Sequence, residues 1–505
     1  MDDFNDWALT LAVFLPLVGA ALMMVVPSAN EELHKLIALA TSLVTMAVGV
    51  YIVAEFDYES AGLQFKVNHS WIDAINSRYQ IGIDGISMPL LLLSMFIVVL
   101  TIIYSWNHFP EPKNPKAFLI LILILEVGMN GTFVAQDLIL FFVFFEIVLL
   151  PMYFMIGVWG GEQRLYAAIK FFLFTLFGSA LMILSFLALY FKGGQSFSIP
   201  FLIENAQAAI GHDTSLWIFA GLFMGFAIKV PMFPFHTWLP DAHTQAPTQG
   251  SVILAAILLK LGTYGFVRIA LPVLPEAAQS WAPWIGLLAV IGIIYGALGC
   301  LAQTDMKRLI AFSSVAHMGF VMLGIATLTP LGVNAAVFGM VAHGLITGML
   351  FFVAGSVKER FHTLEMARLG GLLTQAPRMG WILGFLAMAS LGLPGLAGFW
   401  GEFPAILSAY DPAPGLQNGV YWTYMVIASV GTVLAAGYLL WMLQRVAFGL
   451  VKDEWQDHEI HDMEWPEYVA WTPMLILIVV LGVYPNFLFG IMDESVKATM
   501  SVFAG

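Results

Sequence analysis

Six ionisable residues lie deep inside long apolar runs of this sequence, where a charged side chain is costly. They are Glu146, Lys229, Lys260, His317, His343 and Glu402. A lysine at the middle of a membrane costs roughly 2.5–3.5 kcal/mol on insertion scales, so repeated charges at this depth indicate a function. Carboxylate, ammonium and imidazole groups all take up and release protons. The chemistry that they share is proton transfer through a hydrophobic layer.

Glu146 and Lys229 are expected to act as partners. Glu146 lies nine residues after Asp137, which places it about 13–14 Å along a helix, close to the middle of a bilayer. An isolated carboxylate at that depth would be neutral, whereas one beside an ammonium group stays charged. The alternative is a static ion pair that only fixes helix packing.

Lys260 has no acidic residue in its own apolar run or in the one before it. Loss of hydration favours the neutral form of a lysine, and a neutral lysine can accept a proton. His317 and His343 can take a proton on one ring nitrogen and release it from the other, so we expect them to connect Lys260 to Glu402. The alternatives are structural hydrogen bonds for the histidines and helix capping for Glu402.

Four further ionisable residues have roles that the sequence leaves open. Lys170 lies near the start of its apolar run and is expected to extend its ammonium group to the membrane interface. Glu126 is either a second carboxylate near the pathway or a group satisfied locally. Asp241 and His243 follow a proline-rich break, where they either gate proton uptake or hold the turn.

Composition requires that lipid, rather than water, solvates most of the surface. Hydrophobic residues make up 60% of the 505 residues and charged residues only 10%, and the mean hydropathy is +0.86. Because backbone groups must satisfy one another in lipid, we predict an all-α membrane protein. The single cysteine, Cys300, excludes a disulfide framework and a thiolate-bound cluster.

The apolar runs predict fourteen spanning helices, two of which are broken. The expected spans are 8–26, 34–54, 82–106, 117–135, 137–158, 166–191, 215–236, 248–271, 282–302, 308–326, 332–356, 379–409, 420–448 and 468–490. The seventh is broken by Pro231 and Pro234 just after Lys229, and the twelfth by a glycine-rich run at 392–398 just before Glu402. Matching breaks five spans apart predict two inverted five-helix repeats, spans 4–8 and 9–13.

The expected domains follow from these repeats, and the basic residues predict their orientation. The domains are helices one to three (1–116), the first repeat (117–271), the second repeat (282–448), and an acidic loop with the last helix (449–505). Loops after odd spans hold twelve basic residues: Lys35, Lys113, Lys116, Arg164, Lys307, Arg308, Lys358, Arg360, Arg368, Arg378, Arg445 and Lys452. The other loops and the tails hold five: Lys66, Arg78, Lys192, Arg268 and Lys497. This bias predicts both termini on the outer side.

The net charge of −13 comes mainly from the loop at 453–467 and gives no indication of nucleic-acid binding. His458 and His461 in this loop have a metal-ligand spacing, but no third ligand accompanies them. A solvated surface that docks a partner is favoured over a metal site.

Five segments between spans five and twelve carry a family resemblance. They are FEIVLLPMYFMIGVWG (145–160), AIKVPMFPFHTWLPDAHTQAPT (227–248), ILLKLGTYG (257–265), DMKRLIAFSSVAHMG (305–319) and LPGLAGFWGEF (393–403). In order and spacing they resemble the antiporter-like proton-pumping subunits of respiratory complex I, most closely the chain M (chain 4) branch. Sister branches and Mrp-type cation/proton antiporters usually carry lysine where this chain has Glu402.

The resemblance implies fourteen helices, two inverted repeats and a proton path through Glu146, Lys229, Lys260, the two histidines and Glu402. It implies no cofactor in this chain, with NADH, FMN, iron–sulfur clusters and quinone held by partner subunits. The implied partners are other complex I membrane subunits, including sister antiporter-like chains, in a bacterial inner membrane. A subunit of a multi-chain Mrp-type antiporter is the alternative function, and a scaffold whose buried charges only set helix register is a third.

Overall fold

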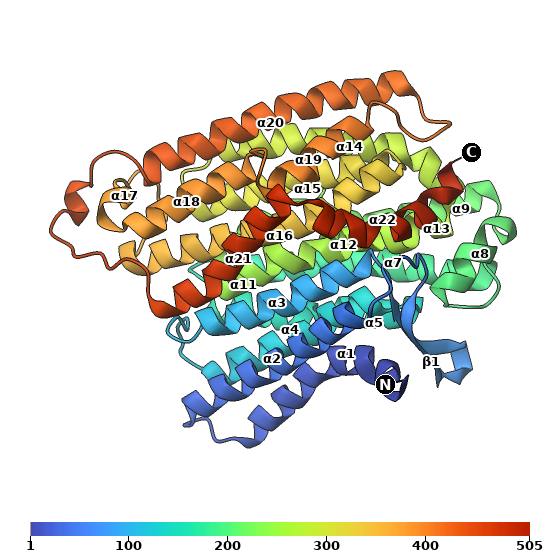
Figure 1. Ribbon diagram of the computed structural model, residues 1–505, viewed down its shortest axis with the longest axis horizontal. Helices are drawn as coiled ribbons and strands as arrows, with labels where there is room; N and C mark the ends of the chain where they lie inside the picture. Colours follow the sequence, from blue (N-terminus) through green and yellow to red (C-terminus); the bar gives the residue numbers. More distant parts are fainter. Residues whose placement is uncertain (1, 505) are drawn as a thin grey trace.

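Long helices cross the molecule side by side in the computed structural model, which describes residues 2–504 (Figure 1). Twelve helical segments in this part of the chain are long and apolar enough to span a membrane. Eleven of them are α1 (Asp2–Val25), α2 (Glu31–Glu55), α3 (Ser87–Tyr104), α4 (Pro115–Val134), α5 with α6 (Leu138–Ile147 and Leu149–Trp159), α7 (Arg164–Lys192), α14 (Pro275–Leu301), α15 (Met306–Ala326), α16 (Pro330–Phe361), α20 (Asn418–Val446) and α21 (Trp465–Val483). The predicted helical membrane fold is confirmed.

The twelfth segment, Thr248–Val273, is a composite helix that contains two π-helical turns. It runs through α11 (Thr248–Ile253), η2 (Leu254–Leu258), α12 (Leu259–Gly265), η3 (Phe266–Ala270) and α13 (Leu271–Val273). Its most apolar stretch is completely buried, as is that of α16. Helices that are apolar on all sides belong in the centre of a bundle, and these two form the core around which the others pack.

Two further helices are broken where the sequence predicts. α9 (His212–Lys229) is followed by an irregular turn and then by α10 (Trp238–Gln245), because Pro231 and Pro234 lack the N–H groups that would continue the helix. α18 (Pro377–Ser390) and α19 (Ala397–Ser408) are separated by a turn in which Gly392 and Gly395 have φ angles of 83° and 96°. Glycine adopts this left-handed region without steric cost. The count of fourteen spans requires that both broken pairs also cross, and it stays a prediction, as do the inverted repeats.

Polar side chains cap the first turn of three helices, α4, α5 and α15. Asp137 accepts hydrogen bonds from the N–H groups of Ile139 and Leu140 at the start of α5. Asn114 and Asp305 cap α4 and α15 in the same way. Each cap satisfies backbone donors that the helix itself leaves free, and thereby sets the depth at which the following apolar residues begin.

A two-stranded antiparallel hairpin between α2 and α3 was not predicted. It consists of β1 (Gln64–Ile72) and β2 (Ser77–Ile83) and lies at the end of the bundle where α1 begins and α22 ends (Figure 1). The predicted third span at 82–106 is therefore wrong at its start, because residues 82 and 83 are in the strand and the helix begins at Ser87. The Asp84 carboxylate accepts from the N–H groups of Ile86 and Ser87, which ends the strand and starts the helix.

The remaining elements are short. Within the predicted interfacial segment 196–211, residues Ile199–Ala209 form α8. The predicted last span at 468–490 is wrong at its end, because α21 stops at Val483 before Pro485 and α22 (Asn486–Met500) follows. The other short elements are η1 (Asp73–Ile75), α17 (Leu372–Gln375), η4 (Asp453–Trp455) and η5 (Ser501–Phe503).

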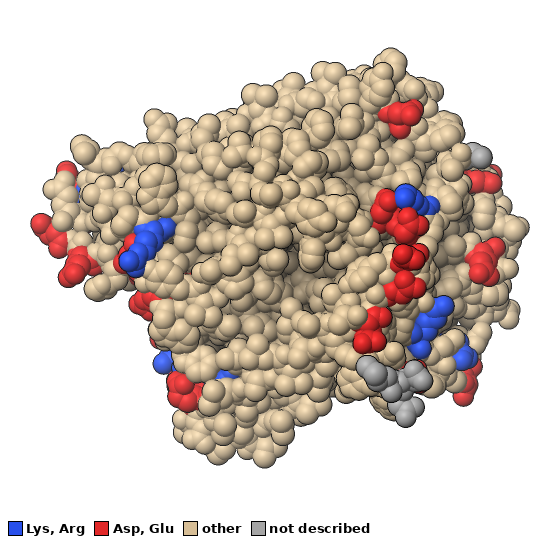
Figure 2. Space-filling view, in the orientation of Figure 1, with Lys and Arg blue, Asp and Glu red and all other residues tan. Residues whose placement is uncertain are grey.

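Charged side chains gather at the two ends of the helices and leave an uncharged band between them (Figure 2). The band contains many exposed apolar residues, such as Val433, which is 70% exposed on α20, and Trp381, which is 72% exposed on α18. Lipid tails are the environment that suits such a band.

Candidate functional site

Lys260 lies at the centre of the bundle and is completely buried. Its Nζ donates to the carbonyl oxygen of Ala255 at 2.5 Å and lies 2.7 Å from Nδ1 of His343. The carbonyl belongs to η2, where the wider π turn redirects backbone groups; such turns are frequent at functional sites. Both hydrogen-bond partners of Nζ in the described structure are neutral groups, a backbone carbonyl and a ring nitrogen, and neither is a carboxylate.

The two predicted histidines lie next to each other on adjacent helices. His343 on α16 and His317 on α15 have ring centroids 6.0 Å apart. Nδ1 of His343 faces Lys260, and its Nε2 has no hydrogen-bond partner among the described residues. His343 thus contacts Lys260 and lies beside His317, and the role of the two histidines stays a prediction.

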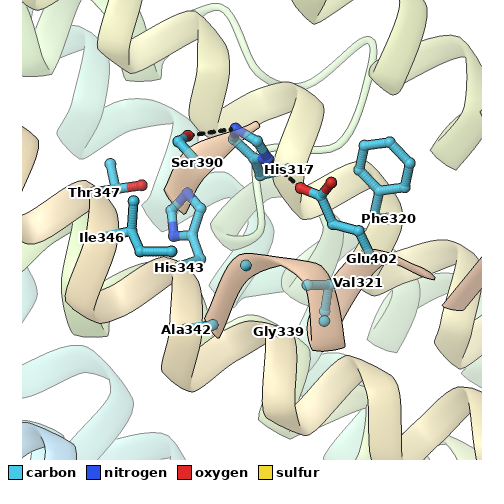
Figure 3. A pocket seen from close by; sticks show the side chains of 12 residues that line it. His317, Phe320, Val321, Gly339, Ala342, His343, Ile346, Thr347, Ser390 and Glu402 are labelled. Atoms are coloured by element: carbon cyan, nitrogen blue, oxygen red, sulfur yellow. Dashed lines mark hydrogen bonds and ion pairs between the residues drawn. The ribbon is translucent and has the colours of Figure 1, made fainter. Parts of the chain in front are cut away.

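His317 has polar partners at both ring nitrogens (Figure 3). Nδ1 lies 2.6 Å from Oε1 of Glu402 on α19, whereas Nε2 lies 3.1 Å from both Oγ of Ser390 and the hydroxyl of Tyr438. When Glu402 is ionised, Nδ1 must carry the hydrogen of this contact, because a carboxylate only accepts. Nε2 of the neutral ring is then an acceptor for a hydroxyl group.

A small cavity separates the second histidine from the carboxylate of α19. The space open to the centre of a water molecule is ≈ 20 Å³, which is room for about one water. His343, His317, Thr347, Ser390 and Glu402 all line it (Figure 3). One oxygen of Glu402 and one nitrogen of His343 lack a protein partner among the described residues, so both are available to a bridging water.

Close backbone contact holds α19 against α16. A Cβ atom added to Gly401 would lie 2.5 Å from the Cα atom of Gly339, so a larger residue at position 401 would push the helices apart. Glu402 is the next residue, and it is only 8% exposed. The close approach of Gly401 to Gly339 therefore positions the carboxylate beside His317.

Glu146 and Lys229 lie on different helices and do not form the expected ion pair. The carboxylate of Glu146 accepts a hydrogen bond from the hydroxyl of Ser179 on α7. Nζ of Lys229 is 4.7 Å from the centre of the Phe145 ring and has no hydrogen-bond partner in the described chain. The hydroxyl of Ser179 satisfies the carboxylate, and the aromatic face supplies the ammonium group with a weaker cation–π contact.

Lys170, Asp241 and His243, whose roles the sequence leaves undecided, have different surroundings in the structure. Lys170 does not extend freely to the interface, because its Nζ pairs with Asp241 at 2.7 Å, and Arg308 reaches the other oxygen of Asp241 at 3.3 Å. His243 is fully buried, its ring stacks on Phe351, and neither ring nitrogen has a partner among the described residues.

Glu126 is completely buried against α2. Ser42 donates to one of its oxygens at 3.4 Å, and the other has no hydrogen-bond partner in the described part of the chain. No contact that the structure shows joins Glu126 to the Lys260 chain, so the local alternative is favoured for this residue.

A second buried charge pair was missed from the sequence. Arg268, counted above as a loop residue, lies inside the composite helix, and its guanidinium group is 2.6 Å from the carboxylate of Asp84. It also donates to the hydroxyl of Tyr264 at 3.0 Å. The signal that could have revealed it is its position in an apolar run, where an unpaired arginine would be costly.

Comparisons with known proteins relate this chain to two kinds of membrane complex. Residues 135–435 match the family described as "NADH:quinone oxidoreductase/Mrp antiporter, TM", and residues 11–132 match "NADH-ubiquinone oxidoreductase chain 4, amino terminus". NADH-quinone oxidoreductase subunit M of Rhodobacter capsulatus is 40% identical over 97% of this chain and 95% of its own length.

Two solved structures share the fold. A chain of respiratory complex I from Thermus thermophilus with bound NADH has a TM-score of 0.86 and 29% identity, covering 98% of this chain and 100% of that one. A chain of the Mrp complex from Dietzia sp. DQ12-45-1b also has a TM-score of 0.86, with 18% identity, covering 99% of this chain and 100% of that one. At that identity the second likeness concerns the fold alone.

Proposed function

Because this chain belongs to the NADH:quinone oxidoreductase/Mrp antiporter membrane family, we propose that it is a proton-translocating membrane subunit of respiratory complex I, of the subunit M (chain 4) type. The observation that carries the proposal is the series of titratable side chains at the bundle centre. It runs from Lys260 through His343 and His317 to Glu402, with two direct contacts and one gap of a single cavity.

The proposed mechanism uses the charge state of the first repeat to control this series. Glu146 and Lys229 are close enough to interact electrostatically but are not locked into a contact pair. A small change in their separation alters the local field, and in a low dielectric that field alters how tightly Lys260 holds its proton. Moving one proton against 100 mV needs about 2.3 kcal/mol, which such a change in field can supply.

The energy for this change comes from electron transfer in partner subunits. NADH, FMN, iron–sulfur clusters and quinone belong to those subunits, and this chain contributes only proton transfer. Its proposed partners are the other membrane subunits, with sister antiporter-like chains beside it. Its proposed location is a bacterial inner membrane, with both termini on the outer side, as the distribution of basic residues predicts.

The alternative is a subunit of a multi-chain Mrp-type antiporter, which needs no electron donor. The 40% identity to an NADH-quinone oxidoreductase subunit, over nearly the full length of both chains, favours the complex I function. Glu402 favours it as well, because lysine is usual at that position in Mrp-type relatives. Iron–sulfur and flavin subunits that co-purify with the chain in mild detergent would exclude the alternative.

Replacing Lys229 with alanine is expected to lower this chain's coupled proton transfer about tenfold while the complex still assembles. The change removes the ammonium group that sets the field around Glu146, and the buried side chain has no hydrogen bond to lose. The measurement is the number of protons pumped per electron by the purified complex in sealed vesicles.

Lys192→Ala is the matched control, because Lys192 is exposed at the end of α7. It should leave the ratio unchanged. An undiminished ratio in the Lys229 variant, with normal electron transfer, would refute the proposed coupling.

A further inference from the structure

Two hydroxyl groups outside the predicted relay converge on one nitrogen of His317. Oγ of Ser390 and the hydroxyl of Tyr438 each lie 3.1 Å from Nε2, and both side chains are at least 95% buried. Nε2 has one lone pair or one hydrogen, so it engages one hydroxyl fully at a time. A buried ring with two alternative hydroxyl partners is not needed for packing alone.

Ser390 departs from the usual behaviour of a serine in a helix. The hydroxyls of Ser408, Thr423 and Ser429 donate to backbone carbonyls three or four residues earlier in their own helices. Ser390 is the last residue of α18, and its only hydrogen bond in the described structure is the one to His317. The break that follows α18 places this hydroxyl against the ring rather than along its own helix.

The position of Ser390 gives the contact a direction. Ser390 lines the same small cavity as His343 and lies on the His343 side of the His317 ring, whereas Glu402 lies on the other side (Figure 3). The Ser390 hydroxyl therefore offers a proton that leaves His343 through the cavity a route to Nε2 of His317. A hydroxyl suits this place because it can donate and accept at once, which neither a carboxylate nor an amide group does with a single atom.

We propose that Ser390 is a proton-relay residue that passes protons from the cavity to Nε2 of His317, and that Tyr438 is a positioning residue that holds this ring. The inference rests on the proposed function. A water in the cavity takes a proton from Nε2 of His343, whose N–H bond breaks, and gives one of its own protons to Oγ of Ser390. The O–H bond of the serine breaks in the same step as an N–H bond forms at Nε2 of His317. The Nδ1–H bond then breaks as an O–H bond forms on Oε1 of Glu402.

Tyr438 is suited to the positioning role because its hydroxyl is carried by a rigid ring. The side chain is completely buried on α20, a continuous helix of 29 residues. Ser390, in contrast, ends a helix beside a glycine-containing turn, and its hydroxyl rotates about a single bond. The tyrosine keeps Nε2 engaged while the serine hydroxyl turns towards the cavity.

The test compares Ser390→Ala with Ser390→Thr in the whole complex, reconstituted into sealed vesicles. This chain's contribution to pumping is defined as the difference in protons per electron between the unaltered complex and a Glu402→Gln variant. Ser390→Ala should lower the rate of that contribution about tenfold, whereas Ser390→Thr, which keeps a hydroxyl, should retain it. Ser408→Ala is the matched control, because its buried hydroxyl bonds only within its own helix.

Tyr438→Phe tests the positioning role with the ring preserved. It should slow proton transfer about tenfold and raise the solvent isotope effect, because the imidazole loses one fixed partner. Tyr421→Phe on the same helix is its control, since that hydroxyl donates to the Ala326 carbonyl away from the relay. If Ser390→Ala fails to assemble, Ser390→Cys carries the same test with a weaker donor.

Full pumping by Ser390→Ala, or equal loss in the alanine and threonine variants, would overturn the relay role of Ser390. Full pumping by Tyr438→Phe with an unchanged isotope effect would overturn the positioning role. If instead Glu402→Gln itself keeps the full proton-to-electron ratio, the proposed function fails and not merely this inference.

Discussion

Replacing Lys260 with methionine should lower this chain's proton transfer by about a hundredfold or more. Electron transfer should slow only to the extent that it remains coupled to that proton transfer. Methionine has similar length and tolerates burial, so the core should keep its packing. What is lost is the group that gives a proton to, or takes one from, Nδ1 of His343. Without it the histidines and Glu402 have no source of protons from the first repeat.

The measurement is proton pumping per electron in sealed vesicles, at matched content of assembled complex. Lys66→Met, on the exposed face of β1, provides a control for loss of a lysine as such. Normal pumping by the Lys260 variant would favour the scaffold explanation, in which the buried charges only fix helix register.

Replacing Arg268 with methionine should destabilise the chain by about 3–5 kcal/mol, because it leaves the Asp84 carboxylate buried without its partner. The side chains of the pair are only 8% and 5% exposed. Burial alone would raise the pKa of Asp84, but the guanidinium group of Arg268 holds it below the ordinary value of 3.8. The pair therefore stabilises the fold above that pH, and the contribution is lost as the pH falls through the lower folded-state pKa.

The free energy of unfolding in detergent micelles, from denaturant titration, is the quantity to measure. The double variant Arg268→Met/Asp84→Asn should recover most of the loss, since both charges are then gone. Arg368→Met is the surface control: its partner Glu454 is 42% exposed, and pairs of that kind contribute at most about 1 kcal/mol. A loss for Arg268→Met no greater than for this control would contradict the prediction.

The helices and the relay could be predicted because both follow from the cost of burial in lipid. Every helix that spans a membrane must be an apolar run of sufficient length. A charged residue inside such a run is costly, so it indicates a partner or a function. That argument singled out Lys260, His343, His317 and Glu402, which the structure places close together at the bundle centre. It also located the two breaks, because proline and glycine interrupt helices for local reasons.

The parts that the sequence could not supply depend on pairing between distant segments. The hairpin needs two strands to meet, and β1 is too polar to be recognised among apolar runs. Ser390 and Tyr438 are common residues in membrane helices, and only the packing of α18 and α20 against α15 brings them to His317. Burial predicts that Glu146 needs a partner but not which one, and its hydrogen bond comes from Ser179 rather than from Lys229.

The π turns of the composite helix have a consequence for its angular register. A π turn adds one residue to a turn without lengthening the helix by a full repeat, so every residue beyond it is rotated by about 100° relative to an uninterrupted α-helix. Lys260 follows one such turn and precedes another. Straightening this turn with all five residues of Leu254–Leu258 kept would rotate the lysine away from α16, whereas deleting a single alanine from it would leave the lysine facing α16. The direction in which this one side chain points thus depends on the wide turn that accommodates the extra residue, independently of the chemistry of the lysine itself.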